Sequence, residues 1–256
     1  KKRKNTKSEI SVNGFWKERG SANQAGRIHT AELDTLNNIL YCASSGGNIW
    51  KGTPEGEDWI SLNDEIKFHD IKMLKLIQMD SLNRLVVCTG KSEFYYTDNE
   101  GETWNQSSGL ENIVSWGHIK KAVAVCDSIN SIYLIASEWN DFTNSQVVQL
   151  YRSQDQGSSF SGVKRFTTNI DRVDIWAPSQ YSDTTVIVAD NLFYTIAGND
   201  NYPDLQSYME IGSAGHTLLT GCATEENTIL YAYLNGDIHR STDNGASYQN
   251  WEIIGD

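Results

Sequence analysis

Proline, histidine and cysteine are scarce in this sequence, with three, five and four residues among 256. No two cysteines form a CxxC pair and no two histidines form an HxxxH pair, so a zinc site is not indicated. Long stretches with helical periodicity are also missing, which argues against a helical fold. We therefore expect free thiols, no bound metal and no cofactor.

Positive charge is also in short supply. The chain has 33 acidic and 21 basic residues, a net charge of −12 and a pI near 4.8. This balance disfavours nucleic acid and anionic membranes as partners. The exception is KKRKNTK at 1–7, with five positive charges. Because no apolar run follows it, this start is neither a signal peptide nor a membrane span. We interpret residues 1–10 as a basic linker and expect no membrane insertion.

The chain does contain a recurring polar turn that ends in an aromatic residue. In RSTDNGASY at 240–248, Ser and Asp side chains can accept hydrogen bonds from nearby backbone N–H groups, and Gly suits a positive φ. SQDQGSSF at 153–160 and TDNEGETW at 97–104 have the same form. The residues of the three turns are Thr97, Asn99, Gly101, Trp104, Ser153, Asp155, Gly157, Phe160, Ser241, Asp243, Gly245 and Tyr248.

Two degraded copies extend the pattern over the chain. GTPEGEDW at 52–59 lacks the acid, and TIAGNDNY at 195–202 has Asn199 in the place of glycine. The glycines, or Asn199, stand at 56, 101, 157, 199 and 245, which are 42 to 56 residues apart. Five units with such a period indicate a repeat architecture.

Each unit contains enough strand-like runs for one propeller blade. Two runs rich in β-branched and aromatic residues precede each turn, as in RLVVCTGKSEFYYT at 84–97, while a third lies upstream and a fourth follows. This predicts an all-β fold: a β-propeller of four-stranded antiparallel blades, about five of them in this chain. We expect blades at about 21–64, 65–115, 116–168, 169–212 and 213–256, within a propeller domain at 11–256.

The S/T-x-D/N-x-G-x-x-W/F/Y pattern resembles the Asp-box (BNR) repeat of sialidases, xyloglucanases, sortilin-type propellers, photosystem assembly factors and secreted bacterial Asp-box proteins. The resemblance implies that each box joins the third and fourth strands of a blade at the rim and is structural, not catalytic. Its aromatic residue then packs between neighbouring sheets. We expect this packing for Trp59, Trp104, Phe160, Tyr202 and Tyr248.

The first residues bear on whether the ring is complete. NGFWKERG at 13–20 is similar to the stretches that follow the boxes, so we interpret residues 11–20 as the outer strand of a closing blade. The fifth unit already has a candidate final strand in SYQNWEII at 247–254. We therefore expect this chain to be part of a larger propeller of about six to eight blades. A closed five-bladed ring with a spare strand is the alternative.

A second set of polar turns lies between the first and second strands of the units. DTLN at 34–37, DSLN at 80–83, DSIN at 127–130 and TEEN at 224–227 are typical of turns. The tripeptides at 34–36, 80–82, 127–129 and 183–185 also resemble an O-glycosylation motif of some Gram-negative bacteria. Modification there would place the protein outside the cytoplasm, and the sequence leaves both interpretations open.

Propellers bind ligands at one mouth of the central channel, and the predicted starts of the first strands here are polar. Four of the five histidines fall at these starts. An insertion at 138–146 adds Trp139 and Phe142 in a predicted polar loop. The candidate ligand-binding residues are Arg27, His29, His69, Asp70, His118, Trp139, Arg172 and His216. Solvated strand ends that tolerate any polar residue are the alternative.

No catalytic constellation stands out. The sialidases that the boxes resemble need an arginine triad and a Tyr/Glu pair, and Arg27-Ile28-His29 is only a faint echo of their opening motif. The xyloglucanases carry an acid before the first-blade Gly-Gly, where this chain has Ser44 and Ser45. Glycoside hydrolysis needs two carboxylates about 5–10 Å apart, and the sequence nominates no such pair.

We therefore expect a non-catalytic binding or scaffold propeller, secreted or displayed on a bacterial surface, that recognises a glycan or an extracellular protein. A glycoside hydrolase of the sialidase-like or xyloglucanase-like kind, with part of its site outside this chain, is the alternative. An organellar assembly factor whose partner is a nascent membrane protein is a third interpretation that the resemblance allows.

Overall fold

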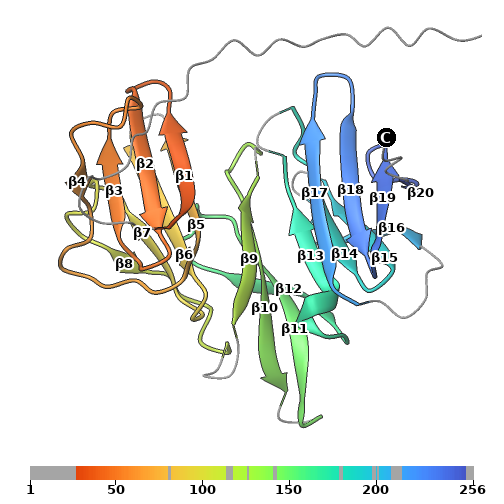
Figure 1. Ribbon diagram of the computed structural model, residues 1–256. Helices are drawn as coiled ribbons and strands as arrows, with labels where there is room; N and C mark the ends of the chain where they lie inside the picture. The colour runs from red at the N-terminus through yellow and green to blue at the C-terminus, as the bar shows by residue number, and fades with distance from the viewer. Residues whose placement is uncertain are drawn as a thin grey trace, which may run out of the picture.

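The computed structural model describes residues 27–251 except 80–81, 114–117, 126, 141–142, 179–180, 198–199, 201 and 209–214. In this part of the chain, 20 strands form five antiparallel sheets of four strands each (Figure 1). Each sheet is one blade, and its strands lie in chain order. The predicted all-β fold of four-stranded blades is confirmed.

The blades have the following strands. Blade 1 contains β1 (Ile28–Asp34), β2 (Ile39–Ser44), β3 (Ile49–Gly52) and β4 (Ile60–Ser61); blade 2 contains β5 (Ile71–Met79), β6 (Leu82–Thr89), β7 (Phe94–Thr97) and β8 (Asn105–Gln106). Blade 3 contains β9 (Ile119–Ala124), β10 (Ile132–Asn140), β11 (Ser145–Ser153) and β12 (Ser161–Phe166). Blade 4 contains β13 (Val173–Trp176), β14 (Thr185–Ala189), β15 (Leu192–Ile196) and β16 (Asp204–Tyr208), and blade 5 contains β17 (Thr217–Ala223), β18 (Thr228–Leu234), β19 (Asp237–Ser241) and β20 (Gln249–Asn250). One 3-10 turn, η1 (Ile170–Arg172), precedes β13.

The blades stack side by side because successive residues of their middle strands bury opposite faces. On β10, Tyr133 and Ile135 pack with residues of blade 4, whereas Leu134 and Ala136 pack with residues of blade 2. The first strands are neighbours in the order β1, β5, β9, β13 and β17. Figure 1 shows the result as an arc, with blade 1 and blade 5 at its two ends. None of the described helical residues forms a segment with the length and hydrophobicity of a membrane-spanning helix.

The Asp boxes fold into one hydrogen-bonded turn between the third and fourth strands. In blade 3, the Ser153 hydroxyl donates to Asp155 Oδ1 (2.7 Å) and accepts from the Gly157 N–H (2.8 Å). Asp155 also accepts from the Ser159 N–H (2.8 Å) and hydroxyl (2.6 Å). Gly157 has a φ of 89°, which suits glycine. The box is therefore a closed local network with a structural role.

The same turn forms in blades 2 and 5. In blade 5, Ser241 and Asp243 accept from the N–H groups of Gly245 and Ser247, each at 2.9 Å. In blade 2, Asn99 Oδ1 accepts from the Thr103 N–H at 3.0 Å. An amide oxygen thus replaces the carboxylate without a change in the turn.

The aromatic residue of a box packs on the preceding blade. The Trp104 indole meets the Phe68 ring edge-on at 5.1 Å and donates to the Leu62 carbonyl at 2.9 Å. In blade 5, Tyr248 stacks on Phe193 of blade 4 with ring centroids 4.0 Å apart. These contacts confirm the packing predicted for Trp104 and Tyr248, and Phe160 is likewise buried.

The same prediction was wrong for Trp59 and Tyr202, whose side chains are 41% and 69% exposed. Trp59 belongs to blade 1, and no blade precedes it in the described part of the chain. Its indole N–H donates to the Gly56 carbonyl of its own turn at 3.1 Å. Nothing in the structure explains the exposure of Tyr202.

The first-to-second-strand turns are also formed as predicted. Asp34 Oδ1 accepts from the N–H groups of Leu36 and Asn37, both at 3.1 Å. Asp127 Oδ1 accepts from the N–H groups of Ile129 (3.2 Å) and Ser131 (2.8 Å).

Several predicted features lie outside the described residues. They are the basic linker at 1–10, the outer strand at 11–20, the turn residue Asn199, the loop residue Phe142 and the end of the last predicted strand at 252–254.

Candidate functional site

One structural position recurs at the start of the first strand in four blades. The carbonyls of Arg27, Asp70 and Arg172 each accept a backbone hydrogen bond from the residue after the second strand of their own blade, at 2.8 to 3.0 Å, and the His118 carbonyl accepts one from Ser137, within β10, at 3.0 Å. The first strands of neighbouring blades run side by side in the same direction (Figure 1). These four residues therefore lie at one end of the arc, which we call the mouth.

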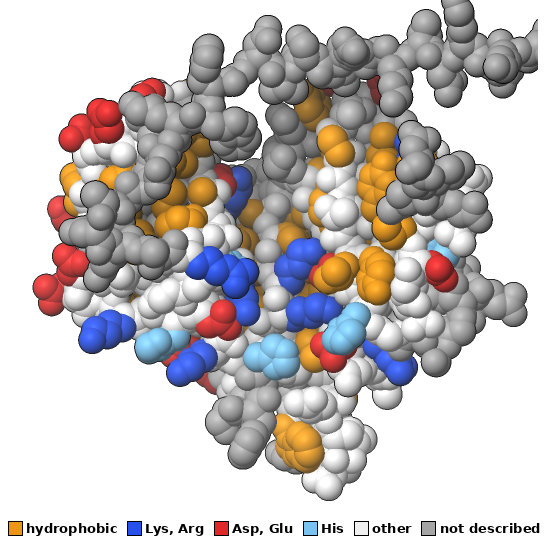
Figure 2. All heavy atoms as spheres, in the orientation of Figure 1, with side chains coloured by type: hydrophobic (Ala, Val, Ile, Leu, Met, Phe, Trp, Pro, Cys, Tyr) orange, Lys and Arg blue, Asp and Glu red, His pale blue; other side chains and the backbone are white. Residues whose placement is uncertain are grey.

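The mouth gathers the sequence-predicted candidates. His29 and His69 lie within one or two residues of this position in blades 1 and 2, and His216 immediately precedes β17 in blade 5. All are exposed except Arg172, which is half-buried. We call the side chains of Arg27, His29, His69, Asp70, His118, Arg172 and His216 the mouth surface. In Figure 2, Lys, Arg and His side chains gather over the centre and lower part of the view, with a few acidic side chains among them, on a chain whose net charge is −12.

Three carboxylates near the starts of the first strands lie beside basic side chains. Asp70 lies 2.9 Å from Lys72 Nζ, and Asp190 lies 3.5 Å from Arg172 Nη1. The His216 ring is 3.9 Å from an oxygen of Asp171. Each of these three acids therefore lies beside a basic side chain, although His216 carries charge only when it is protonated.

Polar contacts hold the His118 ring at the rim. Ser137 Oγ lies 3.2 Å from His118 Nδ1 and accepts from the His118 N–H at 3.1 Å. Ser137 lies on β10, two residues before Trp139, whose side chain is 42% exposed. Trp139 is therefore close to His118 along one blade, and the two candidates belong to the same rim.

The predicted loop at 138–146 was wrong in form. β10 extends into it to Asn140 and β11 begins at Ser145, with Glu138 paired to Val147 and Trp139 to Gln146. The two strands therefore stay paired beyond the buried part of the blade, as far as Asn140 and Ser145. A strand gives Trp139 a fixed direction that a loop does not.

Lys120 is a functional candidate that the sequence analysis missed. Its ammonium donates to the carbonyls of Val173 (2.6 Å), Ile170 (3.1 Å) and Thr217 (3.4 Å), which belong to blades 4 and 5 or to η1 between blades 3 and 4. Burial lowers the pKa of Lys120, although Asp174 and Asp171 oppose the shift. The lysine ties together the starts of three first strands and fixes the geometry of the mouth. In the sequence, the only indication of this role was the pair of lysines in IKKAVA at 119–124.

A second ion pair supports the channel wall below the mouth. Lys121 Nζ lies 3.1 Å from Asp174 Oδ2, which also accepts from the Leu219 N–H at 2.6 Å. Asp174 is almost fully buried. The pair therefore links β9, β13 and β17 and leaves the mouth surface free to contact a ligand.

A buried Tyr/Glu pair tests the hydrolase alternative. Glu138 accepts from the Tyr151 hydroxyl and lies 3.4 Å from Arg165 Nη2. Burial raises the pKa of Glu138, and Arg165 opposes the rise. However, Glu138 and Tyr151 are each only 3% exposed. A glycosidic bond cannot reach either group in this conformation.

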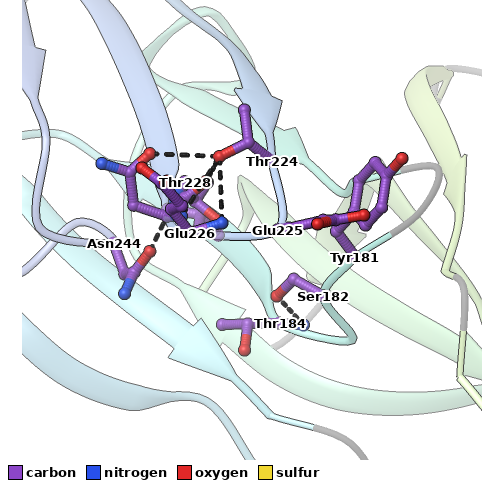
Figure 3. A pocket seen from close by; sticks show the side chains of 10 residues that line it. Tyr181, Ser182, Thr184, Thr224, Glu225, Glu226, Thr228 and Asn244 are labelled. Atoms are coloured by element: carbon purple, nitrogen blue, oxygen red, sulfur yellow. Dashed lines mark hydrogen bonds between the residues drawn. The ribbon is translucent and has the colours of Figure 1, made fainter.

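A pocket of about 210 Å³ lies between blades 4 and 5 (Figure 3). Its walls come from the first-to-second-strand connections, so it lies at the end opposite the mouth. The Thr224 hydroxyl accepts from the Glu226 and Asn227 N–H groups, and Asn244 accepts from the Thr228 N–H at 2.7 Å. These polar groups complete turns. Among the described residues, no three His, Cys, Asp or Glu side chains are grouped to hold a metal ion.

Five four-stranded blades, three of them with a hydrogen-bonded Asp-box turn between the third and fourth strands, decide the fold. The chain has the fold of Asp-box β-propellers. No family model matches the sequence, and no curated protein is significantly similar to it. The evidence for the fold is therefore structural.

Solved structures with this fold include binding proteins and an enzyme. YCF48 from Cyanidioschyzon merolae is 12% identical, with a TM-score of 0.56 over 85% of this chain and 70% of its own. YCF48 bound to D1 peptide is 12% identical, with a TM-score of 0.58 over 88% of this chain and 66% of its own. The Niastella koreensis GH74 enzyme is 18% identical, with a TM-score of 0.51 over 83% of this chain and 29% of its own. The extracellular domain of BT4673, a proposed one-component system of B. thetaiotaomicron, is 13% identical, with a TM-score of 0.60 over 94% of this chain and 29% of its own.

The propeller described here spans only part of the larger neighbours. It covers less than a third of the GH74 and BT4673 chains and about two thirds of YCF48. At these identities the likeness establishes the fold alone.

Proposed function

We propose that this propeller is a non-catalytic binding or scaffold protein that recognises a glycan or a protein outside the cytoplasm through its mouth surface. The observation that carries the proposal is the equivalent position in successive blades. Arg27, Asp70, His118 and Arg172 fill it with side chains that carry charge or donate hydrogen bonds. A fold that repeats one exposed polar position around an axis presents converging groups to a single ligand.

The chemistry of the mouth suits an anionic or hydroxyl-rich partner. Arg27 forms no ion pair with any described residue, so its guanidinium is available for bidentate contact with a carboxylate. Trp139 offers an exposed indole at the same rim. An aromatic face beside cationic and hydrogen-bonding groups serves both sugar rings and peptide side chains.

Two observations support a role without catalysis. Asp70, Asp190 and Asp171 at the mouth lie beside Lys72, Arg172 and His216, whereas glycoside hydrolysis needs one free acid and one free base or nucleophile. The carboxyl group with a raised pKa, Glu138, is buried away from solvent. A neighbour whose structure was solved bound to a peptide, YCF48, and an extracellular domain, that of BT4673, share the fold.

The alternative is a glycoside hydrolase whose site is completed outside this chain. The GH74 neighbour and the Tyr151–Glu138 contact favour it. The two functions differ in what happens to a bound sugar, because a hydrolase releases a shortened product.

A screen on the intact chain separates the two functions. Labelled protein is applied to a glycan array and to a library of peptides with free C-terminal carboxylates, and xyloglucan and sialylated oligosaccharides are incubated with it and examined by mass spectrometry. We expect binding to one class of probe, no shortened oligosaccharide, and loss of binding in Arg27→Ala and Arg172→Ala. Tyr181→Ala, at the opposite end, is the matched control. Product release that Glu138→Gln abolishes would establish the hydrolase instead.

A further inference from the structure

The turn between β17 and β18 shows what a first-to-second-strand connection needs in order to form. Its sequence is TEEN at 224–227, and the Thr224 hydroxyl accepts from the N–H groups of Glu226 (3.3 Å) and Asn227 (3.2 Å) (Figure 3). The side chains at the second and third positions take no part in these bonds. They belong to Glu225 and Glu226, which are exposed, as is usual for charged residues.

The equivalent turn of blade 1 forms in the same way but has different residues at its tip. In DTLN at 34–37, the Asp34 carboxylate takes the place of the hydroxyl and accepts from the N–H groups of the third and fourth residues, both at 3.1 Å. The second and third residues, Thr35 and Leu36, are exposed. Leu36 is 78% exposed, so it has no part in the described core. The turn therefore accounts for the acid but not for the threonine or the leucine.

Blade 3 repeats the arrangement at the middle of the arc. Asp127 Oδ1 accepts from the N–H groups of Ile129 (3.2 Å) and Ser131 (2.8 Å). Ser128 is exposed, and Ile129 is half-buried. The hydroxyls of Thr35 and Ser128 form no hydrogen bond with any described residue. In both blades a turn fixed by its acid thus presents a free hydroxyl to solvent, followed by an aliphatic residue.

We propose that Thr35 and Ser128 are O-glycosylation sites. An acid, a hydroxyl residue and an aliphatic residue form the tripeptide that resembles the O-glycosylation motif of some Gram-negative bacteria, and the fold itself needs only the first of the three. A sugar attached at Thr35 also covers the exposed Leu36 side chain with a hydrophilic group.

The reaction joins the hydroxyl to a sugar that a separate transferase supplies from a glycosyl phosphate or pyrophosphate donor. The hydroxyl oxygen attacks the anomeric carbon and forms the new C–O bond. The bond between that carbon and the donor's phosphate oxygen breaks, and its electron pair stays on the phosphate. The hydroxyl proton passes to a base of the transferase. Thr35 and Ser128 act only as acceptors, so this chain needs no catalytic group.

Exposure separates these sites from a similar tripeptide in blade 4. Asp183-Thr184-Thr185 has the same start, but Thr185 is the first residue of β14 and is fully buried. Thr184 is half-buried and lines the pocket of Figure 3. A transferase cannot surround such a hydroxyl, so we expect Thr184 to stay unmodified. The copy at 80–82 lies partly outside the described residues.

The two sites leave the mouth surface free. They lie where the first strands end, whereas the mouth lies where these strands start. Glycans at Thr35 and Ser128 therefore extend from the opposite end of the arc. The modification is independent of the ligand-binding role proposed above, and the two proposals share only the location outside the cytoplasm.

Peptide mapping by mass spectrometry tests the proposal. The 256-residue chain is fused to an export signal and produced in a Gram-negative bacterium that carries this O-glycosylation pathway. An exported reporter with an unstructured Asp-Thr-Leu tripeptide shows that the pathway is active. We expect glycan adducts, assigned to single residues by electron-transfer fragmentation, on Thr35 and Ser128 and none on Thr184 or Thr224.

Three sets of variants refine the test. Thr35→Ala and Ser128→Ala should each remove one adduct. Leu36→Lys should remove the adduct at Thr35 and keep that at Ser128. Its urea unfolding midpoint should stay close to that of the wild type, because Leu36 gives the turn only its N–H group. The triple change Thr224→Asp, Glu225→Thr and Glu226→Leu installs the tripeptide in blade 5 and should add an adduct there.

Any of three outcomes overturns the proposal. The first is a modified reporter beside a chain whose Thr35 and Ser128 are both unmodified. The second is an adduct that contains phosphate and no sugar, which would assign the turns to a kinase. The third is an adduct at Thr35 that persists in Leu36→Lys, because the aliphatic residue would then have no part in recognition.

Discussion

Phe160 of blade 3 packs edge-on against Phe94 of blade 2, with ring centroids 4.8 Å apart and planes at 61°. Both rings are buried, although they come from different sheets. Phe160→Ala should therefore leave a cavity between blades and cost about 3–5 kcal/mol of unfolding free energy. Urea denaturation followed by tryptophan fluorescence measures it.

Trp59→Ala is the matched control, since it truncates the same box position in blade 1. Its indole is 41% exposed, so the expected cost is below about 1 kcal/mol in the monomer. Equal losses at the two positions would show that the box aromatic does not act by joining blades.

Asp155 predicts how stability depends on pH. Burial raises the pKa of its carboxyl, but hydrogen bonds from Ser159 and Ser153 outweigh burial, so the pKa lies below its ordinary value. The folded state therefore favours the carboxylate, and the resulting stabilisation is present at neutral pH and lost as the pH falls through the lowered pKa. Asp155→Asn should lower the free energy of unfolding at pH 7. The difference from the wild type should shrink as the pH falls through the lowered pKa, and urea denaturation at several pH values measures it.

Asn99 provides the reverse experiment in the same turn. It accepts from the Thr103 N–H as an amide, so Asn99→Asp should introduce a new acid-sensitive step in unfolding. A variant whose stability follows the wild-type pH profile in parallel would contradict the role given to the box carboxylate.

Lys120 should be structurally important despite its polar character. Lys120→Met removes the donor from the carbonyls of Ile170, Val173 and Thr217. Partly buried carbonyls without donors cost about 1–3 kcal/mol. Lys72→Met, which removes only the surface pair with Asp70, should cost less than about 1 kcal/mol. Thermal unfolding of both variants measures the two losses. Equal losses would argue against a structural role of Lys120 in linking β9, β13 and β17.

Glu138 predicts the opposite pH dependence. Because burial raises its pKa, the folded state binds a proton more readily than the unfolded chain. Its contribution to stability therefore grows as the pH falls through the raised pKa and is lost as the pH rises. Relative to the wild type, Glu138→Gln should be most stable at pH 7 and should lose that advantage as the pH falls through the raised pKa, as urea midpoints at several pH values will show. A constant difference across this range would contradict the assignment.

The sequence specified the boxes because every contact within a box is local. Ser153, Asp155 and Gly157 stand two positions apart in the sequence, so their side-chain types are enough to predict the turn. The strand starts could be placed for the same reason, and four of them present Arg27, Asp70, His118 and Arg172 at one structural position.

Contacts between blades could not be predicted in this way. Lys120 and Thr217 are 97 residues apart, and only the arrangement of the sheets brings them together. Trp59 has the local pattern of a packed aromatic but lacks a neighbour in the described chain. The hairpin at Trp139 was missed because polar residues on an exposed strand and in a loop give the same composition.

Binding at the mouth is tested most directly by isothermal titration of one array-positive probe, with mass spectrometry of that probe afterwards. The account predicts that Arg27→Ala and Arg172→Ala each weaken binding about tenfold or more, that Tyr181→Ala binds as the wild type does, and that the probe is recovered intact. Unchanged binding in both arginine variants, or a cleaved probe, would contradict it.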